Sequence, residues 1–322
     1  MTSVFNLPNS KTCLPMIKLR SFAKINLGLE ITGKRADGYH CLRTIFQTID
    51  VCDELELREN YKQKITLAGS NPDIQWGESN IIARACRLLY ENYRIHQGFD
   101  ITVKKNIPPG SGLGGGSGNA AVMLLFLDQY FNLQIPLAEM NILAAGLGAD
   151  VPFFLGGGTA LGEGIGESLT ALPEIAPQPI ALFIPALQVS SALIFSRFSL
   201  TKTALPSKIK LFLKRGDFSA LENELENVTF DLFPEIREIK QKMLQGGCDF
   251  VQMTGSGSAV YGLGRREKLA ALTNLLPGVA LTRTIDKKYY QENIGVWPSG
   301  KASAFGAEIR RFESYRPRKT KC

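Results

Sequence analysis

A run of glycines in residues 110–116 is the part of the sequence whose composition most directly predicts chemistry. Five of these seven residues are glycine, and Ser117 and Asn119 follow them. Glycines let the backbone turn its N–H groups toward a bound group, and the first turn of a helix adds unpaired donors and a positive dipole end. Phosphate is the ligand that such a loop binds. The alternative is that the glycines only form a sharp turn, for which one or two would be enough.

The segments on either side of the glycine run are those that a phosphate loop requires. Ile101 and Val103 alternate with polar residues in the segment 100–105, a pattern that predicts a strand. Residues 120–127 are all apolar, so the segment 117–130 is predicted to be a buried helix. The order strand, glycine loop and helix therefore supports phosphate binding.

The loop does not complete either of two common nucleotide-binding motifs. A Walker A loop ends in Lys followed by Ser or Thr, but the two near matches, ending at Lys34 and Lys301, continue with Arg35 and Ala302. A dinucleotide-type Gly-x-Gly-x-x-Gly is present, but the acidic residue that should close a second strand about twenty residues later is missing. A dinucleotide-dependent oxidoreductase therefore stays open only as an alternative.

Two more polar positions could act on a phosphate held by this loop. Apolar residues alternate with Lys24 and Asn26 in the segment 21–31, so both side chains point from the same face of a predicted strand. A lysine on such a face is most often only solvated, and an aspartate such as Asp150, two residues before Pro152, often caps a helix. In the chemical interpretation, Asp150 accepts a hydroxyl proton and Lys24 offsets phosphoryl charge.

The composition is that of an ordinary globular chain and excludes several classes of function. The 322 residues are 44% hydrophobic and 21% charged, and no apolar run approaches a membrane span. The net charge of +7 is concentrated outside the body of the chain, because the segment 297–322 alone carries +5. We therefore expect no nucleic acid and no membrane as partners. The six scattered cysteines include no C-x-x-C pair, which favours a reduced, cytoplasmic setting without a zinc site.

The loop and four other segments resemble the GHMP kinases, and within them the 4-diphosphocytidyl-2-C-methyl-D-erythritol kinase subfamily. The loop at 108–121 is similar to the second motif of the family, which wraps the phosphates of ATP. The segments 23–27 and 33–40 are similar to the opening signature of the subfamily. The segment 148–154 resembles the one that holds the catalytic aspartate, and 254–258 resembles the third glycine motif.

This resemblance implies a role for each matching residue. The implied catalytic pair is Lys24 and Asp150. The implied ATP-binding residues are Pro108, Gly110, Ser111, Gly112, Leu113, Gly114, Gly115, Gly116, Ser117 and Asn119. The implied substrate-binding residues, among which the aromatic ones hold a cytosine, are Asn26, Tyr39, His40, Ser191, Phe195, Gly255 and Ser256. Gly118 stands where the subfamily usually has a second serine, so a hydroxyl available to phosphate or metal is expected to be missing.

The implied fold is α+β, the GHMP kinase two-domain fold, with an N-terminal domain similar to domain 2 of ribosomal protein S5 and a ferredoxin-like C-terminal domain. Three prolines within residues 173–179 indicate the junction. The N-terminal ATP-binding domain is expected at 17–172 and the C-terminal domain at 173–290. Within the second domain the pattern predicts helices at 208–226, 234–245 and 266–276, and strands at 180–184, 249–253, 259–263 and 279–285. The segment 42–57 fits a helix or a strand.

The two ends of the chain are expected to be disordered, as a lead over residues 1–16 and a basic tail over residues 291–322. Met16 directly precedes the first predicted strand, so one hypothesis is that translation starts there. Residues 311–314 could be encoded by a sequence that resembles the T-arm of a tRNA gene, so the reading frame could run into a neighbouring gene. A nucleic-acid or membrane tether is the alternative for this segment.

The resemblance implies a small-molecule kinase that uses ATP with Mg²⁺ to phosphorylate the 2-hydroxyl of a cytidine diphosphate sugar-alcohol. This reaction belongs to the non-mevalonate route to isoprenoid precursors. No residue is identified as a metal ligand, and the protein is expected to be a monomer or a homodimer. The alternatives are a GHMP kinase acting on homoserine or mevalonate, and a non-catalytic nucleotide-binding or RNA-binding module.

Overall fold

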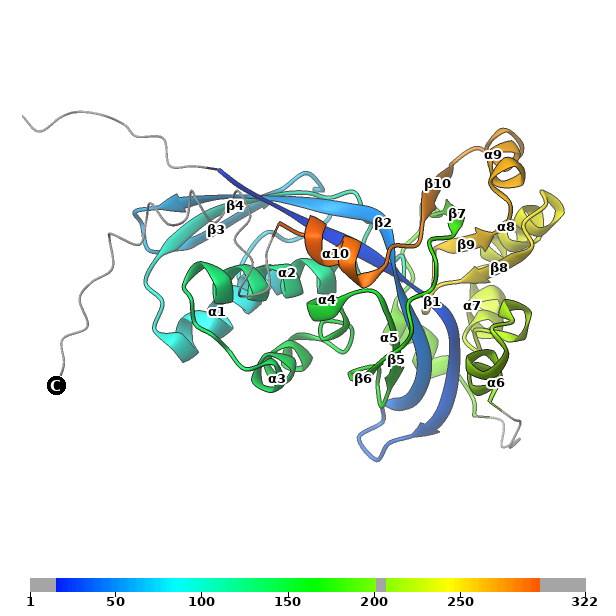
Figure 1. The fold of residues 1–322 in the computed structure, drawn as a ribbon, viewed down its shortest axis with the longest axis horizontal. Helices are drawn as coiled ribbons and strands as arrows, with labels where there is room; N and C mark the ends of the chain where they lie inside the picture. The colour runs from blue at the N-terminus through cyan, green and yellow to red at the C-terminus, as the bar shows by residue number, and fades with distance from the viewer. Residues whose placement is uncertain (1–15, 201–206, 296–322) are drawn as a thin grey trace, which may run out of the picture.

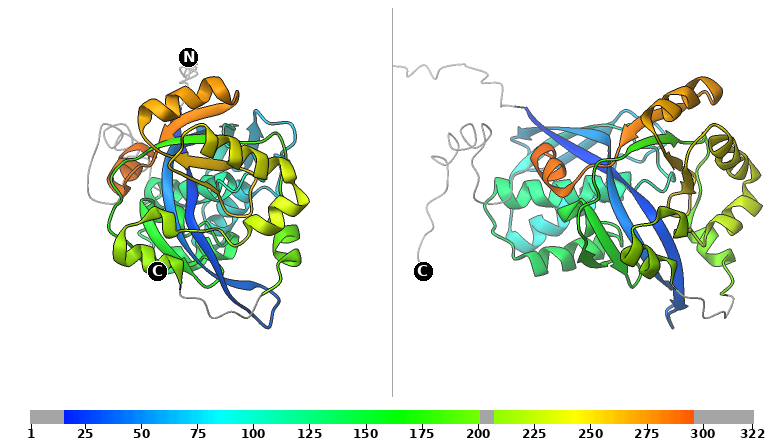
Figure 2. Two further views of the ribbon diagram at one scale, coloured as in Figure 1. Left: turned by 90° about the vertical axis from the view of Figure 1, so that its right-hand side faces the viewer. Right: turned by 45° about the vertical axis from the view of Figure 1, so that its right-hand side comes forward.

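Two long antiparallel strands connect all other parts of the molecule. The computed structural model describes residues 16–200 and 207–295. Strands β1 (Ile17–Lys34) and β2 (His40–Asn60) pair along their whole length, from Ile17 opposite Leu57 to Lys34 opposite His40 (Figure 1). Three register shifts interrupt this pairing, and shifts of this kind bend a strand and increase its twist. Figure 2 shows the pair running through the middle of the molecule.

The first sheet is built on the second edge of β2. Strand β4 (Gly98–Lys104) pairs with the end of β2, and β5 (Thr159–Glu163) pairs with its beginning. Strand β3 (Ile65–Gly69) lies parallel to β4, and β6 (Ser168–Ala171) lies outside β5. Residues 42–57, which the sequence pattern left as helix or strand, are therefore strand. The strand expected at 100–105, before the glycine loop, is β4.

Helices α1 (Ile81–Tyr93), α2 (Gly115–Tyr130) and α3 (Leu137–Leu147) cover one face of this sheet (Figure 1). The short helix α4 (Phe153–Gly156) follows them. Helix α2 is the predicted buried helix, because almost all of its residues up to Leu127 are buried against β1, α1 and α3. A helix that is apolar on every side needs such a central position.

The second sheet has the order β10-β7-β9-β8 and is antiparallel throughout. Its strands are β7 (Pro179–Phe183), β8 (Phe250–Met253), β9 (Val260–Leu263) and β10 (Val279–Arg283). Helices α8 (Pro234–Gln245) and α9 (Arg266–Leu275) pack against it, as the expected α+β arrangement requires. The shorter helices of this part are α5 (Ser191–Arg197), α6 (Lys208–Arg215) and α7 (Glu226–Leu232).

The prediction of a single helix over 208–226 is wrong, because the chain forms two short helices with a break between them. Helix α6 ends at Gly216, which takes a left-handed φ of 71°. Asp217 then accepts a hydrogen bond from the Ser219 N–H and begins the short 3-10 helix η1 (Phe218–Ala220). Glycine with φ above zero and aspartate as a cap are both strong stop signals, and apolar residues on either side of them hid the break.

Helix α10 (Lys287–Asn293) was not expected and packs on the first sheet. The buried ring of Tyr290 lies 5.8 Å from the ring of Phe22, and its hydroxyl donates a hydrogen bond to the Phe154 carbonyl. This helix crosses the boundary expected between residues 290 and 291. The two predicted domain ranges stay predictions, and the proposals for the chain ends concern residues 1–15 and 296–322, which lie outside the described part.

No helix within residues 16–200 and 207–295 combines the length and the apolar composition needed to cross a bilayer.

Tyr290→Ala should lower the free energy of unfolding by about 3–5 kcal/mol, because it leaves a ring-sized cavity between α10 and the first sheet. Tyr290→Phe keeps the ring and loses only a hydroxyl, so it should cost about 1 kcal/mol. Urea denaturation of both variants measures this difference. An alanine variant as stable as the phenylalanine variant would show that α10 adds nothing to the fold.

Candidate active site

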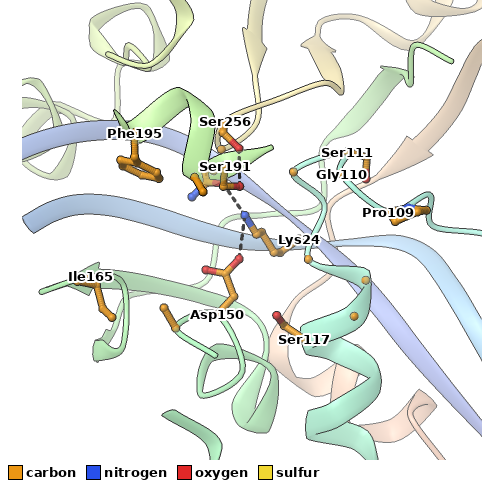
Figure 3. Close-up of a pocket in the computed structure, with 18 of the residues that line it drawn as sticks. Lys24, Pro109, Gly110, Ser111, Ser117, Asp150, Ile165, Ser191, Phe195 and Ser256 are labelled. Atoms are coloured by element: carbon orange, nitrogen blue, oxygen red, sulfur yellow. Dashed lines mark hydrogen bonds and ion pairs between the residues drawn. The ribbon is translucent and has the colours of Figure 1, made fainter. Parts of the chain in front are cut away.

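A cavity of about 1060 Å³ lies between the two sheets and collects nearly every residue singled out from the sequence. Figure 3 shows Lys24 and Asp150 between the glycine loop and the helix that carries Phe195. Of the predicted ATP-binding residues, all except Leu113 line this cavity. The predicted catalytic and substrate-binding residues that also line it are Lys24, Asn26, Tyr39, His40, Asp150, Ser191, Phe195, Gly255 and Ser256.

The glycine loop has the backbone geometry of an anion site. Gly110, Gly112 and Gly114 take φ values of 67°, 76° and 72°, which only glycine adopts without strain. Gly114 begins α2 without a side-chain cap, and the first helical hydrogen bond runs from Gly118 N to Gly114 O at 2.9 Å. The N–H groups of residues 115–117 are therefore the unpaired donors of the helix, at the positive end of its dipole.

Leu113 contributes through its backbone instead of its side chain. The side chain is buried among Ile25, Ile107 and other apolar residues, away from the cavity. Its carbonyl oxygen accepts a hydrogen bond from the Lys24 N–H at 2.9 Å. The loop is thus joined to β1 at the residue that carries the predicted catalytic lysine, which the sequence pattern did not reveal.

Lys24 and Asp150 meet inside the cavity. The Lys24 ammonium lies 3.4 Å from the Asp150 carboxylate, with the lysine side chain 4% exposed and the aspartate side chain 32% exposed. The same ammonium donates a 2.7 Å hydrogen bond to Asn26 Oδ1. Within the described part of the chain, Lys24 is the only hydrogen-bond or ion-pair partner of Asp150. The helix-cap interpretation of Asp150 is therefore wrong, because the N-cap of α4 is Pro152 and no side chain caps that helix.

Aromatic side chains gather at one end of the cavity. The rings of His40 and Phe195 are stacked with centroids 5.7 Å apart, and Phe198 meets the His40 ring edge-on at 5.9 Å. Tyr39 is 62% exposed at the mouth. Ser191 and Ser256 share a 2.7 Å hydrogen bond that joins α5 to the loop between β8 and β9. This end offers flat apolar surfaces with polar groups beside them, as a planar heterocycle requires.

Burial and a nearby positive charge both favour the neutral form of His40. Burial lowers the pKa of His40 below its ordinary value of 6.5, and the positive charge of Lys34 lowers it further. Lys34 is the cross-strand partner of His40 in the β1–β2 register and lines the same end of the cavity. A neutral imidazole offers one donor and one acceptor, which suits it to read the edge of a base.

The opposite end of the cavity was missed by the sequence analysis. It is lined by Ile74, Trp76, Asn80, Ile81 and Lys105. Asn80 also caps α1 by accepting from the Ile82 N–H at 3.0 Å. Lys105 forms a buried ion pair with Asp53, yet burial keeps the pKa of Lys105 below its ordinary value.

Gly118 does not face the cavity, so the expectation that its glycine removes a phosphate or metal ligand is wrong. A Cβ atom at this position would lie 2.7 Å from Ser21 Oγ and 3.1 Å from the Phe22 carbonyl oxygen, both on β1. Ser21 Oγ is buried and has no hydrogen-bond partner within the described residues. Residue 118 therefore controls how closely α2 approaches β1, and of residues 117 and 118 only Ser117 lines the cavity.

The described residues include no cluster of three or more metal-ligating side chains. Ser117 and Asp150 do lie on facing sides of the cavity (Figure 3). One carboxylate and one hydroxyl beside a phosphate loop fit Mg²⁺, which takes few protein ligands and keeps phosphate oxygens and waters.

Two segments of the chain match known family models. Residues 80–158 match the model for the GHMP kinases N terminal domain, and residues 209–274 match the model for GHMP kinases C terminal. A 4-diphosphocytidyl-2-C-methyl-D-erythritol kinase of Pelodictyon phaeoclathratiforme is 39% identical over 268 residues, covering 80% of this chain and 93% of that protein. The kinase of the same name from Bacillus cytotoxicus is 38% identical over 247 residues, covering 75% and 86%.

Solved structures of kinases of the same family have a similar fold. A crystal structure of 4-(cytidine 5'-diphospho)-2C-methyl-D-erythritol kinase is similar with a TM-score of 0.71 and 34% identity, covering 84% of this chain and 99% of that one. The homoserine kinase of Cytophaga hutchinsonii has a TM-score of 0.67 at 18% identity, covering 87% and 98%, and shares the fold.

Gly118→Ala should lower the free energy of unfolding by about 1–3 kcal/mol, because its Cβ would overlap Ser21 Oγ. Helix propensity alone predicts the opposite, a gain of about 1 kcal/mol. In a Ser21→Ala background the overlap is relieved, so the two changes should show a favourable coupling of about 0.5–3 kcal/mol. Urea denaturation of the wild-type protein, the two single variants and the double variant measures the coupling. Additive effects would mean that the two residues do not touch.

Lys34→Met should raise the pKa of His40 toward 6.5, because it removes the positive charge that opposes protonation. NMR titration resolves this, since the chain has only two histidines and His96→Gln assigns the other. Because the unfolded chain binds the proton more tightly, the stability contributed by His40 is complete above pH 6.5 and is lost as the pH falls through its lowered pKa. An unchanged His40 titration in Lys34→Met would contradict this charge effect.

Proposed function

The chain belongs to the 4-diphosphocytidyl-2-C-methyl-D-erythritol kinases of the GHMP kinase family, and on this basis we propose a reaction for its cavity. The protein transfers the γ-phosphoryl group of ATP to the 2-hydroxyl of 4-diphosphocytidyl-2-C-methyl-D-erythritol, in the non-mevalonate route to isoprenoid precursors. The observation that carries this assignment is the Lys24–Asp150 pair at 3.4 Å between a phosphate loop and an aromatic end.

The glycine loop holds the phosphates of ATP. The unpaired N–H groups of residues 115–117 and the dipole of α2 supply donors and positive potential without a flexible side chain. The backbone of the loop is fixed from the second sheet, since Ser258 N and Ala259 N donate to the carbonyls of Gly110 and Ser111 at 3.2 and 3.0 Å. Preorganised donors of this kind stabilise charge where it develops.

Asp150 is the proposed base. Its carboxylate accepts the proton of the 2-hydroxyl as the hydroxyl oxygen forms its bond to the γ-phosphorus and ADP departs. Lys24 forms an ion pair with that carboxylate and offsets the negative charge of the phosphoryl group as it moves. Because Lys24 is almost completely buried, its field is weakly screened by solvent.

The aromatic end is the proposed cytidine site. Tyr39 and Phe195 supply ring faces for the cytosine, and neutral His40 reads its edge. Ser191 and Ser256, which bond to one another here, are polar groups available to the rest of the acceptor. A homoserine or mevalonate substrate has no ring to place at this end, so this end is what selects the acceptor.

The opposite end is the proposed adenosine site. Trp76, Ile74 and Ile81 give it an apolar lining, and Asn80 supplies an amide at its edge. With adenine here and cytosine at the aromatic end, the γ-phosphate of ATP and the 2-hydroxyl of the acceptor meet between the glycine loop and Asp150. Mg²⁺, which neutralises phosphate charge, would be held by ATP oxygens with Ser117 and Asp150.

The proposed compartment is the cytoplasm. Cys41, Cys52, Cys86 and Cys248, the cysteines within the described residues, are free thiols. Free thiols suit a reducing compartment.

Asp150→Asn should lower kcat by about 10²–10⁴-fold, because the amide cannot accept the hydroxyl proton. The KM for ATP should change little, since the residue keeps its size and the loop is untouched. A coupled ADP-release assay with the cytidine substrate measures both constants, and homoserine and mevalonate serve as control acceptors. Turnover of a control acceptor in preference to the cytidine substrate would refute the proposed function, and a fully active Asn variant would refute the role of Asp150.

A further inference from the structure

The side chain of Asn26 is held in one amide orientation by a buried hydroxyl. Thr44 Oγ1 lies 2.5 Å from the carbonyl oxygen of Gly28, which can only accept, so the single hydroxyl proton of Thr44 is used there. The Thr44 oxygen must then accept from Asn26 Nδ2, which lies 2.8 Å away. This places the nitrogen of the amide toward Thr44 and its oxygen toward Lys24 Nζ, at 2.7 Å.

A second buried hydroxyl acts on the other side of the same residue. Thr254 Oγ1 accepts from the Asn26 backbone N–H at 3.0 Å, and it lies 3.2 Å from Asn26 Oδ1 and 3.3 Å from the Gly112 carbonyl. The oxygen of Thr254 is occupied as an acceptor, so its proton points to one of these two oxygens. Thr44 and Thr254 are both completely buried, so removing either hydroxyl leaves a buried polar group of Asn26 without that hydrogen-bond partner.

The amide orientation matters because of the charge beside it. The Lys24 ammonium has three protons and finds Asn26 Oδ1 on one side and the Asp150 carboxylate on the other. A reversed amide would present an NH₂ group to the ammonium, which replaces a charge-assisted hydrogen bond with repulsion. The lysine would then have to leave its position beside Asp150.

We propose that Thr44 and Thr254 are positioning residues that fix the amide of Asn26 and thereby hold the Lys24 ammonium beside Asp150. This inference rests on the proposed kinase function. Thr44 belongs to β2, whereas Thr254 belongs to the loop after β8 in the second sheet and also contacts the phosphate loop at Gly112. The third glycine segment therefore acts on the catalytic lysine through Asn26, in addition to closing the cavity with Gly255 and Ser256.

Thr254→Val tests the proposal, because valine keeps the shape of threonine and removes the hydroxyl. We expect kcat with ATP and the cytidine substrate to fall by about 10–100-fold, the loss usual when a group that orients a key ligand is removed. The KM for ATP should stay within about twofold, because the loop donors remain. Thr254→Ser keeps the hydroxyl and should recover most of kcat.

Thr284→Val is the matched control for loss of a buried hydroxyl. Thr284 is 2% exposed and accepts from the Gln178 N–H at 2.7 Å, but it does not line the cavity. The Thr284→Val variant should unfold at a lower temperature than the wild type and keep the wild-type kcat. If Thr254→Val does not fold, Thr44→Val tests the other side of the amide with the same expected split between kcat and KM.

A double-mutant cycle separates positioning from general stability. In an Asn26→Ala background the amide is absent, so Thr254→Val should lower kcat by no more than about twofold further. A Thr254→Val enzyme with wild-type kcat, a serine variant as impaired as the valine variant, or a full additional loss in the Asn26→Ala background would each overturn the proposal. A wild-type protein without activity on the cytidine substrate would instead overturn the proposed function.

Discussion

The burial of one ammonium group constrains the centre of this structure. Lys24 is a strand residue with a side chain that is almost fully removed from water, and a buried charge is tolerated only with partners that replace its hydration. Those partners are the amide oxygen of Asn26, two residues along the same strand, and the carboxylate of Asp150. The requirement to satisfy this charge explains why segments far apart in the chain converge at one point.

The β1–β2 pair is what makes that convergence possible. It carries Lys24 and Asn26 in its middle and Lys34 with His40 at its end, so a single ribbon supports both the catalytic pair and the aromatic end. The first sheet and α2 supply the phosphate loop on one side. The second sheet supplies the loop after β8, which is bonded to that phosphate loop and to Asn26. The cavity is therefore a property of the junction and belongs to neither sheet alone.

The glycine-rich segment shows that neighbouring residues serve different purposes. Gly110, Gly112 and Gly114 are needed for backbone angles, whereas Gly118 is needed because α2 approaches β1 closely. The absence of a side chain at residue 118 thus lets α2 approach β1. The free N–H groups at the start of the helix provide its anion-binding donors. Leu113, between these glycines, anchors the loop in the apolar core and joins it to Lys24 through its carbonyl.

Local chemistry was enough to identify much of this protein from its sequence. Glycine flexibility, side-chain periodicity and helix stop signals act over a few residues. They predict a phosphate loop, a strand with Lys24 and Asn26 on one face, the end of α2 and both boundaries of α8. The tertiary structure alone decided the direction of Gly118, the lining around Trp76 and Lys105, the docking of α10 and the contact of Thr254 with Asn26. Each of these depends on residues far apart in the chain, 228 positions for Thr254 and Asn26. No local pattern records which distant group a side chain will meet once the two sheets have packed.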